Sequence, residues 1–162
     1  MQPIVSSRPI TILLVDDDPD GRMLVRDIIT TLSSCADIWE AGDGFEALAC
    51  LRGPGETRCP RPDLIYLDVE MPGLGGQEVL KAIRADAALA NVPVVMLTGL
   101  DDEAQRAEAF RNGASGYVVK PTDPARLMTA VAGSVHRWME SRGRTMDGKK
   151  SPRTTCRDYG NE

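Results

Sequence analysis

Histidine and aromatic residues are scarce in this chain of 162 residues, which has one histidine and an aromatic content of 4%. Its four cysteines contain no CxxC pair and no metal-ligand spacing, so a zinc site built from cysteine and histidine is not expected. No segment is long and apolar enough to span a membrane, and the N-terminal residues lack the charged-then-apolar pattern of a secretory signal. These absences predict a cytoplasmic, reduced protein.

The overall composition is that of one globular domain, with 42% hydrophobic and 27% charged residues. A net charge of -5 gives no general reason to expect nucleic-acid binding. Residues 142–162 differ from the rest, because they carry six Lys/Arg against three acids and almost no large aliphatic side chains. We therefore predict an N-terminal extension over 1–9, a folded domain over 10–141 and a disordered basic tail over 142–162. A basic docking or nucleic-acid arm is the alternative for that tail.

Apolar runs of strand length alternate with amphipathic helical stretches along the predicted domain. The runs cover 10–15, 37–41, 64–67, 94–97 and 117–119, and the helical stretches cover 20–32, 45–51, 77–85, 101–112 and 123–141. Residues 52–62 are rich in glycine and proline and are typical of a surface loop. This alternation predicts an α/β fold, in which a five-stranded parallel sheet has helices on both faces.

Polar residues follow the predicted strands, where an open parallel sheet forms its sites. They are Asp16, Asp17 and Asp18 after the first strand, Asp68 after the third, Thr98 after the fourth and Lys120 after the fifth. Asp18 precedes Pro19 and suits a helix N-cap, but the other carboxylates would repel one another without a cation. Oxygen ligands that are few and open to water favour Mg2+ over Ca2+ or Zn2+. Carboxylate, metal, hydroxyl and lysine together suit phosphoryl transfer onto an aspartate.

Five motifs occur in order, each at a strand end or in the final helix. They are VDDD at 15–18, LIYLDVEMPGLGG at 64–76, VVMLTG at 94–99, NGASGYVVKP at 112–121 and the amphipathic last helix. With these motifs the chain resembles the receiver domains of two-component response regulators from about residue 10 to residue 142. The resemblance implies a flavodoxin-like, doubly wound fold with strand order 2-1-3-4-5.

The resemblance also implies roles for single residues. Asp68 would be phosphorylated, and Asp16, Asp17, Asp68 and the backbone carbonyl of Glu70 would hold Mg2+, with Asp16 acting largely through water. Thr98 and Lys120 would each contact a phosphoryl oxygen.

Several neighbouring residues carry more than one interpretation. Thr98 alone could cap the following turn, and Tyr117 could be either a switch aromatic that moves with Thr98 or plain core. A small Gly99 would leave the site accessible, and Leu100 and Glu70 would tune phosphoryl lifetime. The resemblance implies a cis peptide bond before Pro121.

The implied function is that of a phosphoacceptor, which takes a phosphoryl group from a phosphohistidine and then changes its partner-binding surface. It would catalyse only its own phosphorylation and dephosphorylation. Its partners would be a histidine kinase or histidine phosphotransfer protein, and a protein target on the face of the fourth helix, fifth strand and fifth helix. Neither nucleic acid nor membrane binding is expected, and the protein would be a monomer or a phosphorylation-dependent dimer.

Four alternatives remain at this stage. We expect a stand-alone receiver of the chemotaxis or phosphorelay type, because the polar residues after the last helix are too few to fold into an output domain. The chain could instead be the receiver fragment of a larger multidomain regulator, which would look the same in sequence. A nucleotide-binding or flavin-binding domain is disfavoured because Asp16–Asp18 would repel a phosphate. A haloacid-dehalogenase-type phosphatase is disfavoured because its DxD motif would have to stand at the first strand. A receiver that binds partners without being phosphorylated is disfavoured because the sequence carries an intact five-part site.

Overall fold

The computed structural model describes residues 9–33 and 35–145 of the chain. Five strands and five α-helices alternate, with one extra turn of 3-10 helix. In chain order they are β1 (Ile10–Val15), α1 (Pro19–Leu32), β2 (Ala36–Ala41), α2 (Gly44–Arg52), η1 (Gly55–Thr57), β3 (Leu64–Asp68), α3 (Gly76–Ala85), β4 (Val94–Thr98), α4 (Glu103–Arg111), β5 (Gly116–Val119) and α5 (Pro124–Thr145). The alternation predicted from the apolar runs is confirmed.

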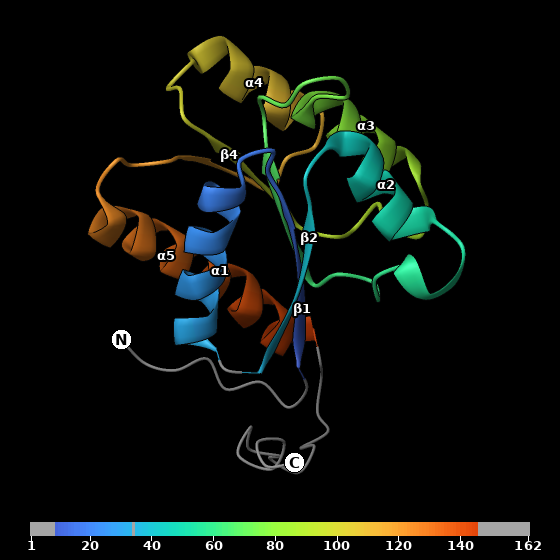
Figure 1. Cartoon of the computed structure of the whole chain (residues 1–162), viewed down its shortest axis with the longest axis horizontal. Coiled ribbons are helices and arrows are strands. Elements are labelled where there is room, and N and C mark those ends of the chain that lie inside the picture. Colours follow the sequence, from blue (N-terminus) through green and yellow to red (C-terminus); the bar gives the residue numbers. More distant parts are fainter. Residues whose placement is uncertain (1–8, 34, 146–162) are drawn as a thin grey trace.

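The strands form one parallel sheet in the order β2-β1-β3-β4-β5, as the resemblance implied. Helices α1 and α5 cover one face of the sheet, and α2, α3 and α4 cover the other (Figure 1). Alternate strand residues therefore enter different cores: Leu13 and Val15 pack with α2 and α3, whereas Ile12 and Leu14 pack with α1 and α5. No helix in the described part of the chain is long and apolar enough to cross a membrane.

Helix ends follow local chemistry. The Asp18 side chain accepts a hydrogen bond from the Asp20 backbone N–H, and Pro19 occupies the first turn of α1, so the predicted cap is confirmed. The predicted helix over 101–112 is shorter, because Asp102 caps α4 by accepting from the backbone N–H groups of Ala104 and Gln105.

Two further boundaries differ from the expectation. Helix α5 continues to Thr145, so residues 142–145, which were predicted to belong to the tail, are helical. The predicted loop over 52–62 contains the short η1 turn. Residues 1–8 and 146–162, which hold most of the predicted extension and tail, lie outside the described residues.

Candidate phosphoryl-transfer site

The polar residues expected at the strand ends meet at one edge of the sheet. Asp16 directly follows β1, Asp68 and Thr98 are the last residues of β3 and β4, and Lys120 directly follows β5. These strands are consecutive in the order β1-β3-β4-β5, and all are parallel, so their carboxyl ends lie side by side. The fold thus brings together four groups that are spread over more than 100 positions of the sequence.

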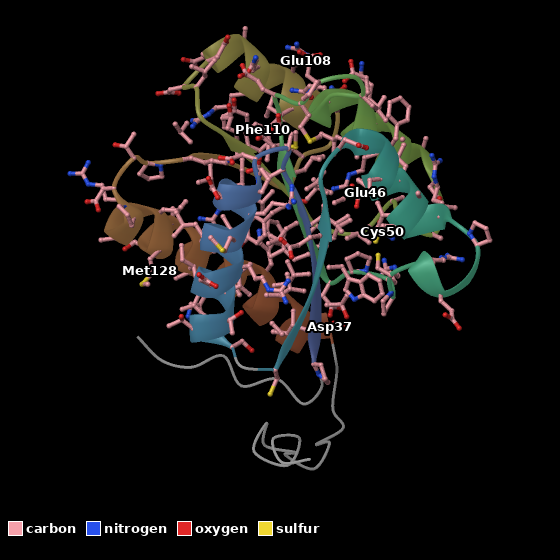
Figure 2. The ribbon with its side chains drawn as sticks, viewed as in Figure 1. Asp37, Glu46, Cys50, Glu108, Phe110 and Met128 are labelled. Carbon is pink, nitrogen blue, oxygen red and sulfur yellow. The ribbon has the colours of Figure 1, made fainter. Side chains whose placement is uncertain are left out.

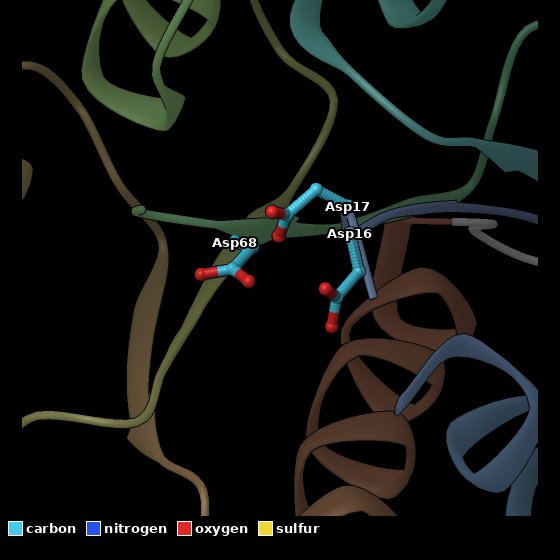
Figure 3. A group of neighbouring side chains, drawn as sticks. All are labelled: Asp16, Asp17 and Asp68. Carbon is cyan, nitrogen blue, oxygen red and sulfur yellow. The ribbon is translucent and has the colours of Figure 1, made fainter. Parts of the chain in front are cut away.

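Three carboxylates form the centre of this edge. Asp16, Asp17 and Asp68 each offer an oxygen, and these oxygens lie within 4.8 Å of one another (Figure 3). Asp16 and Asp68 are buried, with 5% and 8% of their surface exposed, whereas Asp17 is exposed. A cluster of oxygen donors with one side open to solvent fits a hard divalent cation that keeps some of its water ligands.

Lys120 is the cation that faces this cluster. Its ammonium lies 2.6 Å from Asp16 Oδ2 and 3.4 Å from Asp68 Oδ2, and its side chain is only 22% exposed. Burial alone would lower the pKa of Lys120, but the hydrogen bond to Asp16 and the negative charge of Asp68 raise it. Lys120 therefore stays charged and neutralises part of the acidic cluster.

Burial has the opposite consequence for Asp68. Loss of hydration raises the pKa of this carboxyl to about 6, Lys120 opposes the shift and the neighbouring Asp16 reinforces it. One ammonium does not balance three nearby carboxylates, so the folded site holds excess negative charge. This excess is what a bound cation would relieve.

Backbone groups hold both buried carboxylates in place. Asp16 Oδ1 accepts from the Asp18 backbone N–H at 2.9 Å, and Asp68 Oδ1 accepts from the Glu70 backbone N–H at 3.1 Å. Arg22, one turn into α1, donates from Nη1 to the Asp16 carbonyl oxygen. Sequence reasoning missed Arg22. The only available signal was its position on α1 one turn after the Asp18 cap.

Close backbone packing explains the last glycine of the MPGLGG motif. A Cβ on Gly76 would lie 2.1 Å from the Asp68 carbonyl oxygen, so only glycine allows α3 to begin this close to the end of β3. By contrast, a Cβ on Gly99 would meet no atom within 4 Å. The space around the Cβ position of Gly99 is therefore open.

Thr98 and Tyr117 lie beside the acidic cluster. Thr98 is fully buried, and its Oγ1 accepts from the Leu100 backbone N–H at 3.2 Å, so it does cap the following turn. Tyr117 is half-buried against the core of α2, α3 and α4, and the Arg106 guanidinium lies 5.2 Å from its ring centroid. Burial raises the pKa of the Tyr117 hydroxyl and the Thr98 side chain opposes this shift, so the hydroxyl lies near Thr98, although no hydrogen bond of good geometry joins them among the described residues. Both a switch role and a core role remain compatible with this position.

One detail implied by the resemblance is wrong. No cis peptide bond occurs among the described residues, so the bond between Lys120 and Pro121 is trans. Lys120 nevertheless reaches the carboxylates, and its backbone N–H donates to the Thr98 carbonyl oxygen at 2.7 Å.

Comparison with known proteins decides the family. The model of the response regulator receiver domain matches residues 12–132. The chain belongs to this family. It is 37% identical over 127 residues to the DNA-binding response regulator MtrA of Mycolicibacterium smegmatis, and 32% identical over 137 residues to the response regulator Rcp1 of Synechocystis. These alignments cover 78% and 84% of this chain; they span 50% of MtrA and 93% of Rcp1.

Solved structures give the same assignment. The phosphorylated cyanobacterial phytochrome response regulator RcpA superposes with a TM-score of 0.75 at 30% identity, covering 82% of this receiver chain and 96% of RcpA. The Mn2+-bound form of Rcp1 has a TM-score of 0.71 at 33% identity, with 82% and 96% coverage. The receiver family thus accounts for the fold, and the nucleotide-binding and phosphatase alternatives are not favoured.

Proposed function

We propose that Asp68 is the phosphoacceptor of this receiver domain and that Asp16, Asp17, Asp68 and the Glu70 carbonyl hold Mg2+. The observation that carries this proposal is the meeting of three carboxylates and one lysine at a single sheet edge. All donors in the cluster are oxygens, which fits Mg2+. Bound Mg2+ would offset the carboxylate charge and attract a phosphoryl oxygen, which lowers the barrier to attack.

The residues of the chain then have separate tasks. An Asp68 carboxylate oxygen attacks the phosphorus of a phosphohistidine, the new O–P bond forms, and the donor's P–N bond breaks. Lys120, already 3.4 Å from Asp68 Oδ2, moves from Asp16 toward the transferred group and balances its charge. The Thr98 hydroxyl donates to a second phosphoryl oxygen. The receiver acts only on its own aspartate in this scheme.

The output surface would be the face of α4, β5 and α5. Helix α4 buries only Ala109, and Phe110, labelled in Figure 2, is 49% exposed. A helix with so few buried contacts needs little free energy to shift, which suits an element that responds to phosphorylation. Movement of Thr98 with Tyr117 would carry the change from the site to this face.

The phosphoacceptor role is tested by intact-protein mass measurement after incubation with acetyl phosphate, and then with a phosphorylated histidine phosphotransfer protein. We expect a phosphoryl mass gain that requires Mg2+ and disappears in Asp68→Asn. Asp18→Asn is the matched control, because it removes a neighbouring charge, keeps a good N-cap residue and should leave the gain intact. A gain that survives Asp68→Asn would reject Asp68 as the acceptor.

The partners and state of the protein follow from the same proposal. The phosphodonor would be a histidine kinase or histidine phosphotransfer protein, and the site would work in the cytoplasm without nucleic acid or membrane. Light scattering on the phosphorylated and unphosphorylated chain would distinguish a constant monomer from a phosphorylation-dependent dimer. Because the chain spans half of MtrA, a larger multidomain regulator remains a second candidate for its biological context.

A further inference from the structure

Two buried thiols lie together at the opposite edge of the sheet from Asp68. Cys50 is in the last turn of α2, labelled in Figure 2, and Cys59 lies in the connection that leads to β3. Both are free cysteines and belong to the core cluster packed against α2 and α3. Because Cys59 precedes the start of β3 and Asp68 ends that strand, the pair has no part in the proposed phosphoryl transfer.

The backbone brings the two residues to disulfide distance. The Cys59 backbone N–H donates to the Cys50 carbonyl oxygen at 2.8 Å. A carbonyl oxygen and an amide nitrogen lie about 2.4 Å and 1.5 Å from their own Cα atoms, so this bond keeps the two Cα atoms within roughly 6.7 Å. Disulfides span Cα separations of about 4.4 to 6.8 Å. Both side chains enter the same core cluster, and the Cys50 thiol contributes to the raised pKa of Cys59, so the two thiols lie close to each other.

We propose that Cys50 and Cys59 are a modification site, at which a disulfide oxidant converts the two thiols to an intramolecular disulfide. One thiolate attacks the oxidant's S–S bond, forms a mixed disulfide and releases one thiol. The second thiolate attacks the protein sulfur of that mixed disulfide and releases the second thiol. Two electrons and two protons pass from the cysteine pair to the oxidant, and a reductant reverses the reaction. The product is a disulfide that links the last turn of α2 to the connection before β3.

Burial slows oxidation of Cys50 and Cys59 as long as the segment between them stays folded. Burial and the neighbouring Cys50 raise the pKa of Cys59 to about 12, which keeps its thiolate scarce. The intervening segment is mostly exposed, and Gly55 in it has a φ of 83°. A short exposed segment opens locally at a small free-energy cost, and such opening would admit the oxidant.

The test uses the full chain with Cys35→Ser and Cys156→Ser, so that the proposed pair are the only cysteines left in the protein. The folded protein is incubated with oxidised glutathione, alkylated and digested with trypsin without reduction. Cleavage after Arg52 or Arg58 separates the two cysteines in sequence, so a disulfide appears as two peptides joined until reductant is added. We expect this joined species to form in the folded state and the intact protein to lose two hydrogens.

A shifted-thiol variant provides the matched control. Ala49→Cys on a Cys50→Ala background moves the thiol one position along α2 to an exposed site, where it no longer faces Cys59. We expect this variant to yield glutathione adducts instead of the internal bond. Adducts alone on the original pair, a bond that forms only after unfolding in urea, or equal cross-linking in the shifted variant would each overturn the proposal. The wild-type chain, mapped in the same way, should also give Cys50–Cys59.

Discussion

Replacing Asp68 with asparagine should stabilise the metal-free protein at neutral pH. Burial raises the pKa of this carboxyl from 3.8 to about 6, so the folded state disfavours its charged form. The folded state then binds more protons than the unfolded state, and stability falls as the pH rises from about 4 to about 6. At neutral pH the penalty approaches roughly 3 kcal/mol, because each unit of pKa difference is worth about 1.4 kcal/mol. Asparagine keeps the bond from the Glu70 N–H but avoids this penalty.

Part of the gain is lost, because Lys120 lies 3.4 Å from Asp68 Oδ2 and would keep only Asp16 as its charged partner. We therefore expect Asp68→Asn to raise the free energy of unfolding by about 1 to 3 kcal/mol at pH 7.5. In thermal unfolding this corresponds to a rise of roughly 4 °C per kcal/mol.

The assay is urea unfolding in EDTA at pH 4.0, 5.0, 6.0 and 7.5 for wild type and Asp68→Asn. The difference between the two proteins should be small at pH 4.0 and should grow toward neutral pH. Glu56→Gln, an exposed acid in the connection between α2 and β3, is the control and should shift stability little at any pH. A variant that is less stable than wild type at pH 7.5, or a gain that does not depend on pH, would refute this reasoning.

Three further predictions concern the same edge of the sheet. Lys120→Met leaves two buried carboxylates without their cation, so it should lower the free energy of unfolding by about 1 to 3 kcal/mol in urea at pH 7.5. The same variant should be phosphorylated by acetyl phosphate about tenfold or more slowly than wild type. Gly76→Ala forces a Cβ against the Asp68 carbonyl oxygen and should cost more than about 2 kcal/mol by the same measurement, whereas Gly99→Ala, which meets no neighbour, should be nearly neutral. Asp17→Asn removes an exposed ligand, so it should weaken Mg2+ binding about tenfold in calorimetry and change the stability of the metal-free protein little. An unchanged Mg2+ affinity would show that Asp17 is not a ligand.

Much of the fold could be predicted because its signals are local. Continuous apolar runs mark strands that are covered on both faces, and the strand ends were placed within a residue or two of those observed. The cap at Asp18 was predictable because a cap depends on a side chain and a backbone N–H two residues away. The end of α5 was not, because the segment after residue 141 carries no strong stop signal and its polar composition suggested a tail.

The less predictable contacts join residues that are distant in sequence. Arg84 on α3 donates to the carbonyl oxygens of Gly113, Ala90 and Val92. It thereby joins the end of α3 to the segments that precede β4 and β5. Nothing in the residues around Arg84 indicates these acceptors. The proximity of Cys50 to Cys59 is a similar case, because it depends on how the intervening turn folds back.

The sequence by itself determined the alternation of strands and helices, the residue types at each strand end and the helix caps, since all of these depend on neighbours within a few positions. Only the tertiary structure decided that Lys120 contacts Asp16 from 104 positions away and that Asp68 is buried beside both. Burial and distance set the electrostatics, because a carboxyl loses hydration and feels its neighbours only where the chain has folded around it. The acids were visible in the sequence, but their raised proton affinity and need for a cation arise from the packed sheet edge.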